Sequence, residues 1–309
     1  MCRLHGSAWW LAGCRHAPLS RRRPAAGVLP LIAGGSGEAQ GGGQAIVRWL
    51  GGGVVEVATP DYSQVALVDA WYWNNTGWSA FGKQLPTEYA SADGLRSYLR
   101  EKSPQAVLVA LTHDHGDHMG DYFEALSALA DSGLNVRTVG QSDLMRAGLV
   151  QRFRDAGLNP QEIVLSNGNA MNFGGRVQHG DMRAFLVPAI HSTLLGYPAA
   201  GFILDLGGLR FYLSGDTDLY GDLRLLGERY HPDVAVVCAG DGPFTMDPES
   251  AARACEMLGV SQAIPIHYAH NPLVLGPEAG ETFRREVAAR SPGTTVHVLQ
   301  PGDSVTLSG

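Results

Sequence analysis

Three histidines and two aspartates lie within residues 113–118, in the pattern His-x-His-x-Asp-His, directly after an apolar stretch that is typical of a buried strand. Imidazole and carboxylate groups hold zinc, manganese and iron in proteins. Alternate residues of an extended turn point the same way, so His113 and His115 can share one metal ion. Asp117 and His118 then point toward a second ion. The motif therefore predicts a metal centre at the end of a strand.

Short apolar strands lead each half of the chain, and helices alternate with strands later. This order predicts an α/β fold in which two sheets pack together with helices outside, a four-layer αββα sandwich. Strands are expected at residues 45–50, 54–59, 65–69, 106–111, 136–139, 184–188, 201–206, 209–214, 234–238, 263–266, 296–299 and 305–307. Helices are expected at residues 121–131, 142–156, 222–230, 248–258 and 278–289.

Further metal ligands are expected where other apolar strands end. His191, Asp216 and His267 each follow such a strand, as the histidine motif does. Loops at the carboxyl ends of strands are where sites usually form in layered α/β folds. These three residues are therefore candidates to complete a centre with two metal ions.

The order of these ligands resembles the metallo-β-lactamase superfamily, over about residues 45 to 308. The resemblance implies the metallo-β-lactamase fold and two ligand groups bridged by Asp216: His113, His115 and His191 for one ion, and Asp117, His118 and His267 for the other.

Within that superfamily, the chain looks most like the ascorbate-6-phosphate lactonase-like branch of metal-dependent hydrolases. N-acyl-phosphatidylethanolamine phospholipase D looks like a more distant relative. The segments that carry this resemblance include residues 49–51, 190–192, 214–217, 244–252 and 264–268. Two positions depart from it: Gly52 stands where relatives often have histidine, and Ala70 follows Asp69 where they often have proline.

These ligands predict a hydrolase that opens a lactone, ester or phosphoester with a hydroxide held between two divalent cations. Zinc is the first expectation, with manganese or iron as alternatives. Asp216 would keep the ions together, and Asp117 would orient the nucleophile and carry its proton. Asp114 and Asp121 are expected either to fix histidine tautomers or to be surface carboxylates. A β-lactamase, an iron-dependent oxidoreductase and a non-catalytic metal-binding module are the competing interpretations.

Substrate contacts are expected from an aromatic loop after Asp69 and from the residues that follow His267. A cluster of aromatic side chains beside a hydrolytic site is a plausible lid, or else a hydrophobic plug or dimer contact. The candidates are Trp71, Trp73, Trp78, Tyr268, His270 and Asn271.

Composition excludes several classes of protein. Formal net charge is −7 over 309 residues, and Lys83 and Lys102 are the only lysines. A nucleic-acid surface normally needs a basic stripe, so a nuclease is disfavoured. No apolar run approaches the roughly 20 residues of a spanning helix, so stable membrane insertion is not expected. A small-molecule substrate is the expected partner, and self-association into a homo-oligomer stays open.

Residues 1–43 are expected to lie outside the folded domain, which is placed at residues 44–309. Ser20-Arg21-Arg22 resembles a twin-arginine export signal, although Pro24 and Pro30 interrupt the apolar stretch that follows. A flexible leader or a start codon placed too far upstream is the alternative. The expected location is the cytoplasm, with export to the periplasm as the alternative.

Overall fold

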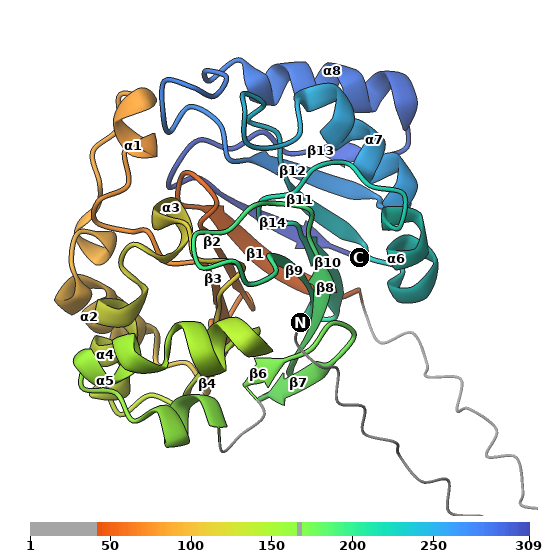
Figure 1. Ribbon diagram of the computed structural model, residues 1–309. Helices are drawn as coiled ribbons and strands as arrows, with labels where there is room; N and C mark the ends of the chain where they lie inside the picture. The colour runs from red at the N-terminus through yellow and green to blue at the C-terminus, as the bar shows by residue number, and fades with distance from the viewer. Residues whose placement is uncertain (1–41, 166–168) are drawn as a thin grey trace, which may run out of the picture. The chain divides into compact units, whose positions relative to one another are not determined.

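The computed structural model describes residues 42–165 and 169–309, and its strands form two seven-stranded sheets (Figure 1). The first sheet has the strand order β14-β1-β2-β3-β4-β5-β6, and the second has the order β13-β12-β11-β10-β9-β8-β7. The strands of the first sheet are β1 (Gln44–Trp49), β2 (Val55–Ala58), β3 (Gln64–Val68), β4 (Ala106–Ala110), β5 (Val136–Gln141), β6 (Ala170–Met171) and β14 (Ser304–Ser308). Those of the second are β7 (Arg176–His179), β8 (Met182–Pro188), β9 (Ala200–Leu206), β10 (Leu209–Leu213), β11 (Val234–Cys238), β12 (Gln262–Ile266) and β13 (Thr295–Val296).

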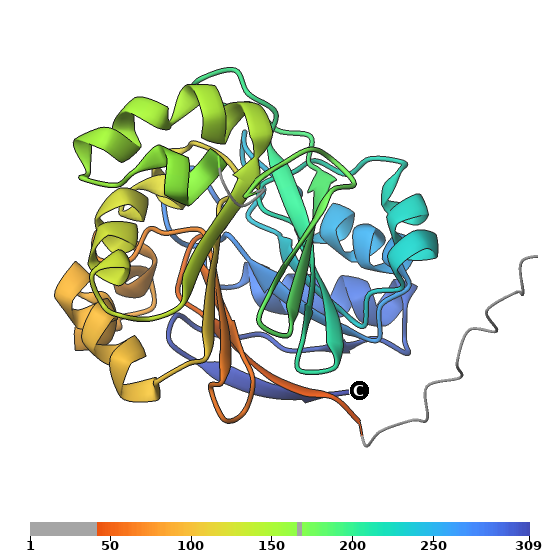
Figure 2. The same cartoon turned by 90° about the horizontal axis from the view of Figure 1, so that it is seen from below.

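Helices cover the outer face of each sheet, so the described domain has the predicted αββα layers (Figure 2). The first sheet is covered by α1 (Gly77–Ala80), α2 (Ala92–Lys102), α3 (Gly116–Met119), α4 (Tyr122–Ala130) and α5 (Val150–Asp155). The second is covered by α6 (Leu223–Tyr230), α7 (Pro248–Leu258) and α8 (Ala279–Arg290). Three short helical turns complete the set: η1 (Thr87–Tyr89), η2 (Leu144–Gly148) and η3 (Gln161–Leu165).

Three apolar cores hold the layers together. One lies between the sheets and includes Val47, Leu108 and Phe202. The other two lie between each sheet and its helices. Strands β4 and β11 are buried at every residue because they face the other sheet on one side and helices on the other. This explains why their sequences are continuous apolar runs.

The direction of the strands brings several loops to one edge of the sandwich. Strand β4 runs parallel to β3, and β10, β11 and β12 run parallel to one another. Strand β8 shares their direction because β9 is antiparallel to both β8 and β10. The carboxyl ends of β8, β10 and β12 therefore meet at one edge of the second sheet, where each delivers a predicted metal ligand.

The structure departs from the predicted elements in places. The helix expected at residues 142–156 is instead the π-helical turn η2 followed by α5. A side chain at Gly148 would lie 2.7 Å from the Tyr197 ring, so this glycine allows the close approach, and glycine weakens a helix interior. The strand expected at residues 296–299 is wrong beyond Val296, and α2 and β7 were not predicted.

The predicted leader lies outside the described residues except for its last two positions. In the part of the chain that is described, no helix combines the length and apolarity needed to cross a bilayer.

Candidate metal centre

The histidine motif begins three residues after the end of β4 and continues into α3. Buried His113 lies in the loop, and His115 precedes the first helical residue, Gly116. Asp117 and His118 lie on α3 itself, so their side chains extend from helical backbone, unlike those of His113 and His115. His191 follows β8, Asp216 follows β10 and His267 follows β12, as the pattern predicted.

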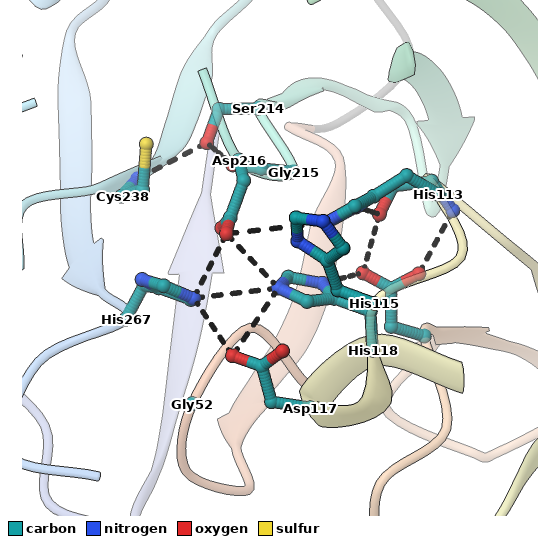
Figure 3. A network of polar contacts seen from close by, with 12 residues as sticks. Gly52, His113, His115, Asp117, His118, Ser214, Gly215, Asp216, Cys238 and His267 are labelled. Atoms are coloured by element: carbon teal, nitrogen blue, oxygen red, sulfur yellow. Dashed lines mark hydrogen bonds and ion pairs between the residues drawn. The ribbon is translucent and has the colours of Figure 1, made fainter. Parts of the chain in front are cut away.

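One carboxylate oxygen lies at the middle of this cluster. Oδ2 of Asp216 is 3.1 Å from His267 Nε2 and 3.3 Å from His118 Nε2. The same oxygen is 3.6 Å from His191 Nε2 and 4.0 Å from His113 Nε2. In Figure 3 this carboxylate points toward His113, His118 and His267. Four imidazoles, two from the histidine motif and one each from the segments after β8 and β12, therefore converge on one atom.

The seven predicted ligands fall into two spatial groups. The first contains His113, His115, His191 and Asp216, and the second contains Asp117, His118 and His267; within each group the ligand atoms lie within 4.8 Å of one another. In the first group, His191 Nε2 is 3.2 Å from His115 Nδ1. In the second, His118 Nε2 is 3.3 Å from His267 Nε2.

Two buried polar atoms show that this donor set fits metal ions. Nε2 of His113 and Oδ1 of Asp216 are buried and lack hydrogen-bond partners among the described residues. Leaving such groups unpaired is costly. Nitrogen and carboxylate donors in this number suit divalent cations such as zinc. The residues present therefore fit the metal ions that the ligand pattern implies.

Charge coupling within the centre is strong. Burial opposes the charged form of His118, but the carboxylates of Asp216, Asp69 and Asp117 raise its pKa well above the usual value. Burial likewise opposes charge on Asp216, whereas His118 and His267 bring its pKa well below the usual value. Burial opposes charge on His267 too, but Asp216 raises its pKa to about 9. Cationic charge is thus favoured around the Asp216 carboxylate.

Asp69 supports the centre from behind, a role that the sequence did not suggest. Its Oδ2 is 2.6 Å from His118 Nδ1 and accepts a hydrogen bond from Thr112 Oγ1. The Thr112 hydroxyl is in turn 3.0 Å from His113 Nδ1. One buried acid therefore orients a histidine in each ligand group. The sequence signal that could have indicated this role was the position of Asp69 at the end of β3, which pairs with β4.

Asp114 and Asp121 do not fix histidine tautomers, and neither is a surface carboxylate, so both predictions for them are wrong. Both side chains are buried. Asp114 accepts hydrogen bonds from the backbone N–H groups of Leu194 and Leu195. Asp121 accepts them from the backbone of Tyr72 and Trp73 and from the Asn74 side chain. Each carboxylate anchors a loop beside the centre.

Glycines admit the histidines and an aromatic ring to the centre. A Cβ at Gly53 would lie 2.2 Å from His118 Cε1, so only glycine leaves room for that ring. Gly52 has φ +56°, and a Cβ there would lie 3.1 Å from the Trp71 ring. Trp71 thus packs against the position where the resemblance implied a histidine. Ala70 exchanges backbone hydrogen bonds with His118 and Asp121.

A cavity of about 280 Å³ opens beside the ligands. Of the predicted substrate contacts, Trp71, His270 and Asn271 line it. Trp78, a residue of α1, is buried in the core between the first sheet and its helices, and Trp73 packs half-buried against that core. Tyr268 is buried between the sheets, where its hydroxyl donates to Leu299. Substrate contact by Trp73, Trp78 and Tyr268 therefore does not fit their positions.

Two residues that line the cavity were not predicted from the sequence. Thr76 lies in the aromatic loop, and its hydroxyl donates a hydrogen bond to the backbone oxygen of His270. Phe244 lies between β11 and α7. The sequence signal that could have indicated Phe244 was its position after the apolar strand β11. The complete lining consists of Trp71, Thr76, His115, Asp117, His191, Asp216, Phe244, His267, His270 and Asn271.

Comparison with known proteins identifies the family. A family model described as a Beta-lactamase superfamily domain matches residues 70–268. A UPF0173 metal-dependent hydrolase of Nitratidesulfovibrio vulgaris is 36% identical over 201 residues, which are 65% of this chain and 77% of the relative. One from Archaeoglobus fulgidus is 32% identical over 216 residues, 67% of this chain and 84% of the relative. The chain therefore belongs to the metallo-β-lactamase superfamily, as one of its metal-dependent hydrolases.

Solved structures agree on the fold. Igni18, a metallo hydrolase from Ignicoccus hospitalis KIN4/I, is 24% identical, with 85% of this chain and 98% of that chain covered and a TM-score of 0.64. An isothiocyanate hydrolase from Delia radicum gut bacteria is 18% identical, with 85% and 99% covered and a TM-score of 0.55. At these identities the likeness concerns the αββα sandwich alone.

Proposed function

We propose that the protein uses two divalent cations, with zinc as the first candidate, to open a lactone, an ester or a phosphoester. The observation that supports this most is the position of Asp216 Oδ2, within 4.0 Å of imidazole nitrogens from both ligand groups. A carboxylate so placed can bridge two ions. His113, His115 and His191 would hold one ion, and Asp117, His118 and His267 the other.

Two such ions would supply a hydroxide at neutral pH and polarise the oxygen of the scissile group. Asp117 is the ligand candidate with the most exposed carboxylate, at 28% of its side chain. It is therefore placed to accept a proton from the attacking water and pass it to the leaving oxygen. The water oxygen bonds to the carbonyl carbon or phosphorus, and the bond to the ester oxygen breaks. An ester or phosphoester gives an acid and an alcohol, and a lactone gives a single hydroxy acid.

The cavity wall provides contacts for the substrate. His270 lies with Nε2 3.4 Å from Asp117 Oδ2, and its buried Nδ1 has no hydrogen-bond partner among the described residues. In this proposal it contacts polar atoms of the substrate next to the scissile bond. Trp71 packs edge-on against His270, with ring centroids 6.1 Å apart, and forms an apolar wall. Asn271 offers an amide at the same rim.

The test combines metal analysis with a substrate panel. We expect about two zinc ions per chain by elemental analysis and turnover of at least one lactone, ester or phosphodiester. His115→Ala and Asp216→Ala should lose bound metal and activity while keeping a native circular dichroism spectrum. His179→Ala is the matched control, because His179 lies on β7 and bonds to the backbone of Asn135.

Three results would contradict the proposal. They are substantial activity in both ligand variants, no turnover of any substrate by metal-replete protein, and bound iron with redox activity. Preferential turnover of a β-lactam panel would replace the proposed substrate class with the alternative one.

A further inference from the structure

Exposed apolar side chains gather on the loops that carry the metal centre. Among the described residues, seven large hydrophobic side chains are exposed, and five of them lie on three loops with site residues. Leu194 is 74% exposed and Leu273 is 62% exposed. We call the five the apolar mouth: Ile190, Leu194 and Leu195 after β8, Phe244 after β11, and Leu273 after β12.

The apolar mouth continues the cavity that holds the ligand candidates. Phe244 belongs to both, because it lines the cavity and is 38% exposed. Ile190 directly precedes His191, and its backbone N–H donates to Thr217 Oγ1, next to Asp216. Leu273 donates its backbone N–H to the side chain of Asn271, which lines the cavity. Exposed apolar groups concentrated in this way mark a binding surface.

Hydrogen bonds fix the loop that carries the two leucines. Asp114 accepts from the backbone N–H groups of Leu194 and Leu195 at 2.8 and 2.7 Å. Thr193 Oγ1 donates to the backbone oxygen of Tyr197 at 2.7 Å. The loop is therefore held in the conformation that exposes both leucines. A binding surface ordered in advance pays a smaller entropic cost when a ligand binds.

Charge argues for an uncharged ligand. None of the described residues that line the cavity is lysine or arginine. Phosphate or carboxylate tails are normally held by arginine or lysine side chains. The other basic side chains among the described lining residues are the histidines, which surround the reacting group. The part of the substrate that lies farther out thus meets the exposed apolar side chains of the mouth.

We propose that the apolar mouth binds the alkyl chain of an acyl ester or acyl lactone whose carbonyl group reaches the metal centre. This inference rests on the proposed hydrolase function and narrows its substrate to uncharged acyl compounds. The cavity of about 280 Å³ lies at the small end of the range for ligand pockets, roughly 300–1,000 Å³. It can enclose the reacting head of such a molecule while the chain lies along the mouth.

The test measures kcat/KM for 4-nitrophenyl butyrate, hexanoate, octanoate and decanoate below their aggregation limits. Burying one methylene group is worth about 0.8 kcal/mol, or roughly fourfold. Since the mouth stays partly open, we expect kcat/KM to rise about twofold to fourfold per methylene. In the double variant Leu194→Ser, Leu273→Ser the decanoate-to-butyrate ratio should fall at least about tenfold. Leu225→Ser is the matched control, since Leu225 is 58% exposed on α6.

A second readout does not depend on turnover. Calorimetry with uncharged decanamide and butyramide should show tighter binding of decanamide, and the double variant should lose this difference. A flat chain-length series in the wild type, or an unchanged ratio in the double variant, overturns the inference while ester turnover leaves the hydrolase function standing. No turnover of any ester, lactone or phosphoester overturns the hydrolase function itself.

Other occupants of the mouth give different results. A dimer in sedimentation analysis that the double variant dissociates, without a chain-length preference, would assign the mouth to a second copy of the chain. Binding to phosphatidylcholine vesicles that the double variant loses, again without a chain-length preference, would assign it to a membrane surface. Either result overturns the inference.

Discussion

Asp69 and His118 are 49 positions apart in the chain, yet Asp69 Oδ2 lies 2.6 Å from His118 Nδ1. Both side chains are fully buried. The contact fixes the ring so that Nε2 faces Asp216. It arises because β3 and β4 are parallel neighbours, which places the residues after each strand side by side.

Asp69→Asn should weaken metal binding about 10- to 100-fold, the usual cost of losing the partner of a ligating histidine. Asparagine keeps the size of the side chain but lacks its negative charge. Affinity is measured by zinc competition with a chromophoric chelator. Tyr72→Phe is the control, because the Tyr72 hydroxyl donates only to the backbone oxygen of Asp69 among the described contacts. Equal zinc affinity in Asp69→Asn and wild type would remove Asp69 from the metal centre.

Gly53→Ala should displace His118 and lower kcat/KM about 100-fold, as a ligand misplacement of about 1 Å can do. The added methyl group would start 2.2 Å from His118 Cε1, and the ring has no room to retreat because Asp69 lies behind it. Elemental analysis should show less than two metal ions per chain. Gly293→Ala is the control, since no described atom lies within 4 Å of its added Cβ. Full metal content in Gly53→Ala would show that the ring can shift without cost.

Asp121→Ala should lower the free energy of unfolding by about 2–4 kcal/mol in urea denaturation, because three donors lose their acceptor. These donors are the backbone N–H groups of Tyr72 and Trp73 and the amide of Asn74. The variant should also raise KM, since Trp71 lies in the same loop and lines the cavity. Asp121→Asn keeps an acceptor oxygen, so both the drop in the free energy of unfolding and the rise in KM should be smaller than in Asp121→Ala. If the alanine variant is as stable and active as the asparagine variant, Asp121 does not anchor this loop.

Glu56 should make stability depend on pH. Burial raises its pKa above the ordinary 4.5, while Arg48 and the hydroxyls of Tyr89, Tyr98 and Tyr62 oppose the rise. A raised pKa means that the protonated form is favoured in the folded state. The stability that Glu56 contributes through its raised pKa is therefore fully present below pH 4.5. It is lost as pH rises through the folded-state pKa.

Glu56→Gln should remove that dependence, because glutamine does not titrate. The free energy of unfolding of the wild type, minus that of the variant, is expected to fall as pH rises above 4.5. Urea denaturation of both proteins between pH 4.5 and 8 measures the difference. Parallel curves for the two proteins would contradict the pKa assignment.

Sequence patterns predicted which site residues follow strands far better than they predicted the contacts between those residues. Each candidate ligand followed an apolar strand, and this local rule was enough to select His191, Asp216 and His267. Asp69 also follows an apolar strand, but its contact with His118 depends on which strands are neighbours in the sheet. The pairing of β3 with β4 is a property of the whole sheet and leaves no local signature.

The aromatic loop shows a second limit of local patterns. Trp71 and Trp78 are seven residues apart and were both predicted to contact the substrate, but Trp78 lies on α1. Trp71 lines the cavity, whereas Trp78 lies in the core, where a Cβ at Gly302 would come within 2.6 Å of its ring. Trp78 packs against the turn that contains Gly302, and Trp71 packs against Gly52, so each position depends on a distant part of the chain.

The two carboxylates that anchor the loops bind mainly main-chain N–H groups. Asp114 requires only that residues 194 and 195 are not proline, and Asp121 makes the same demand of residues 72 and 73. The side chains on these loops are therefore free to change while the loops stay attached beside the metal ligands. Such a frame permits new substrate preferences to evolve, by substitution at positions such as Leu194, without rebuilding the catalytic centre.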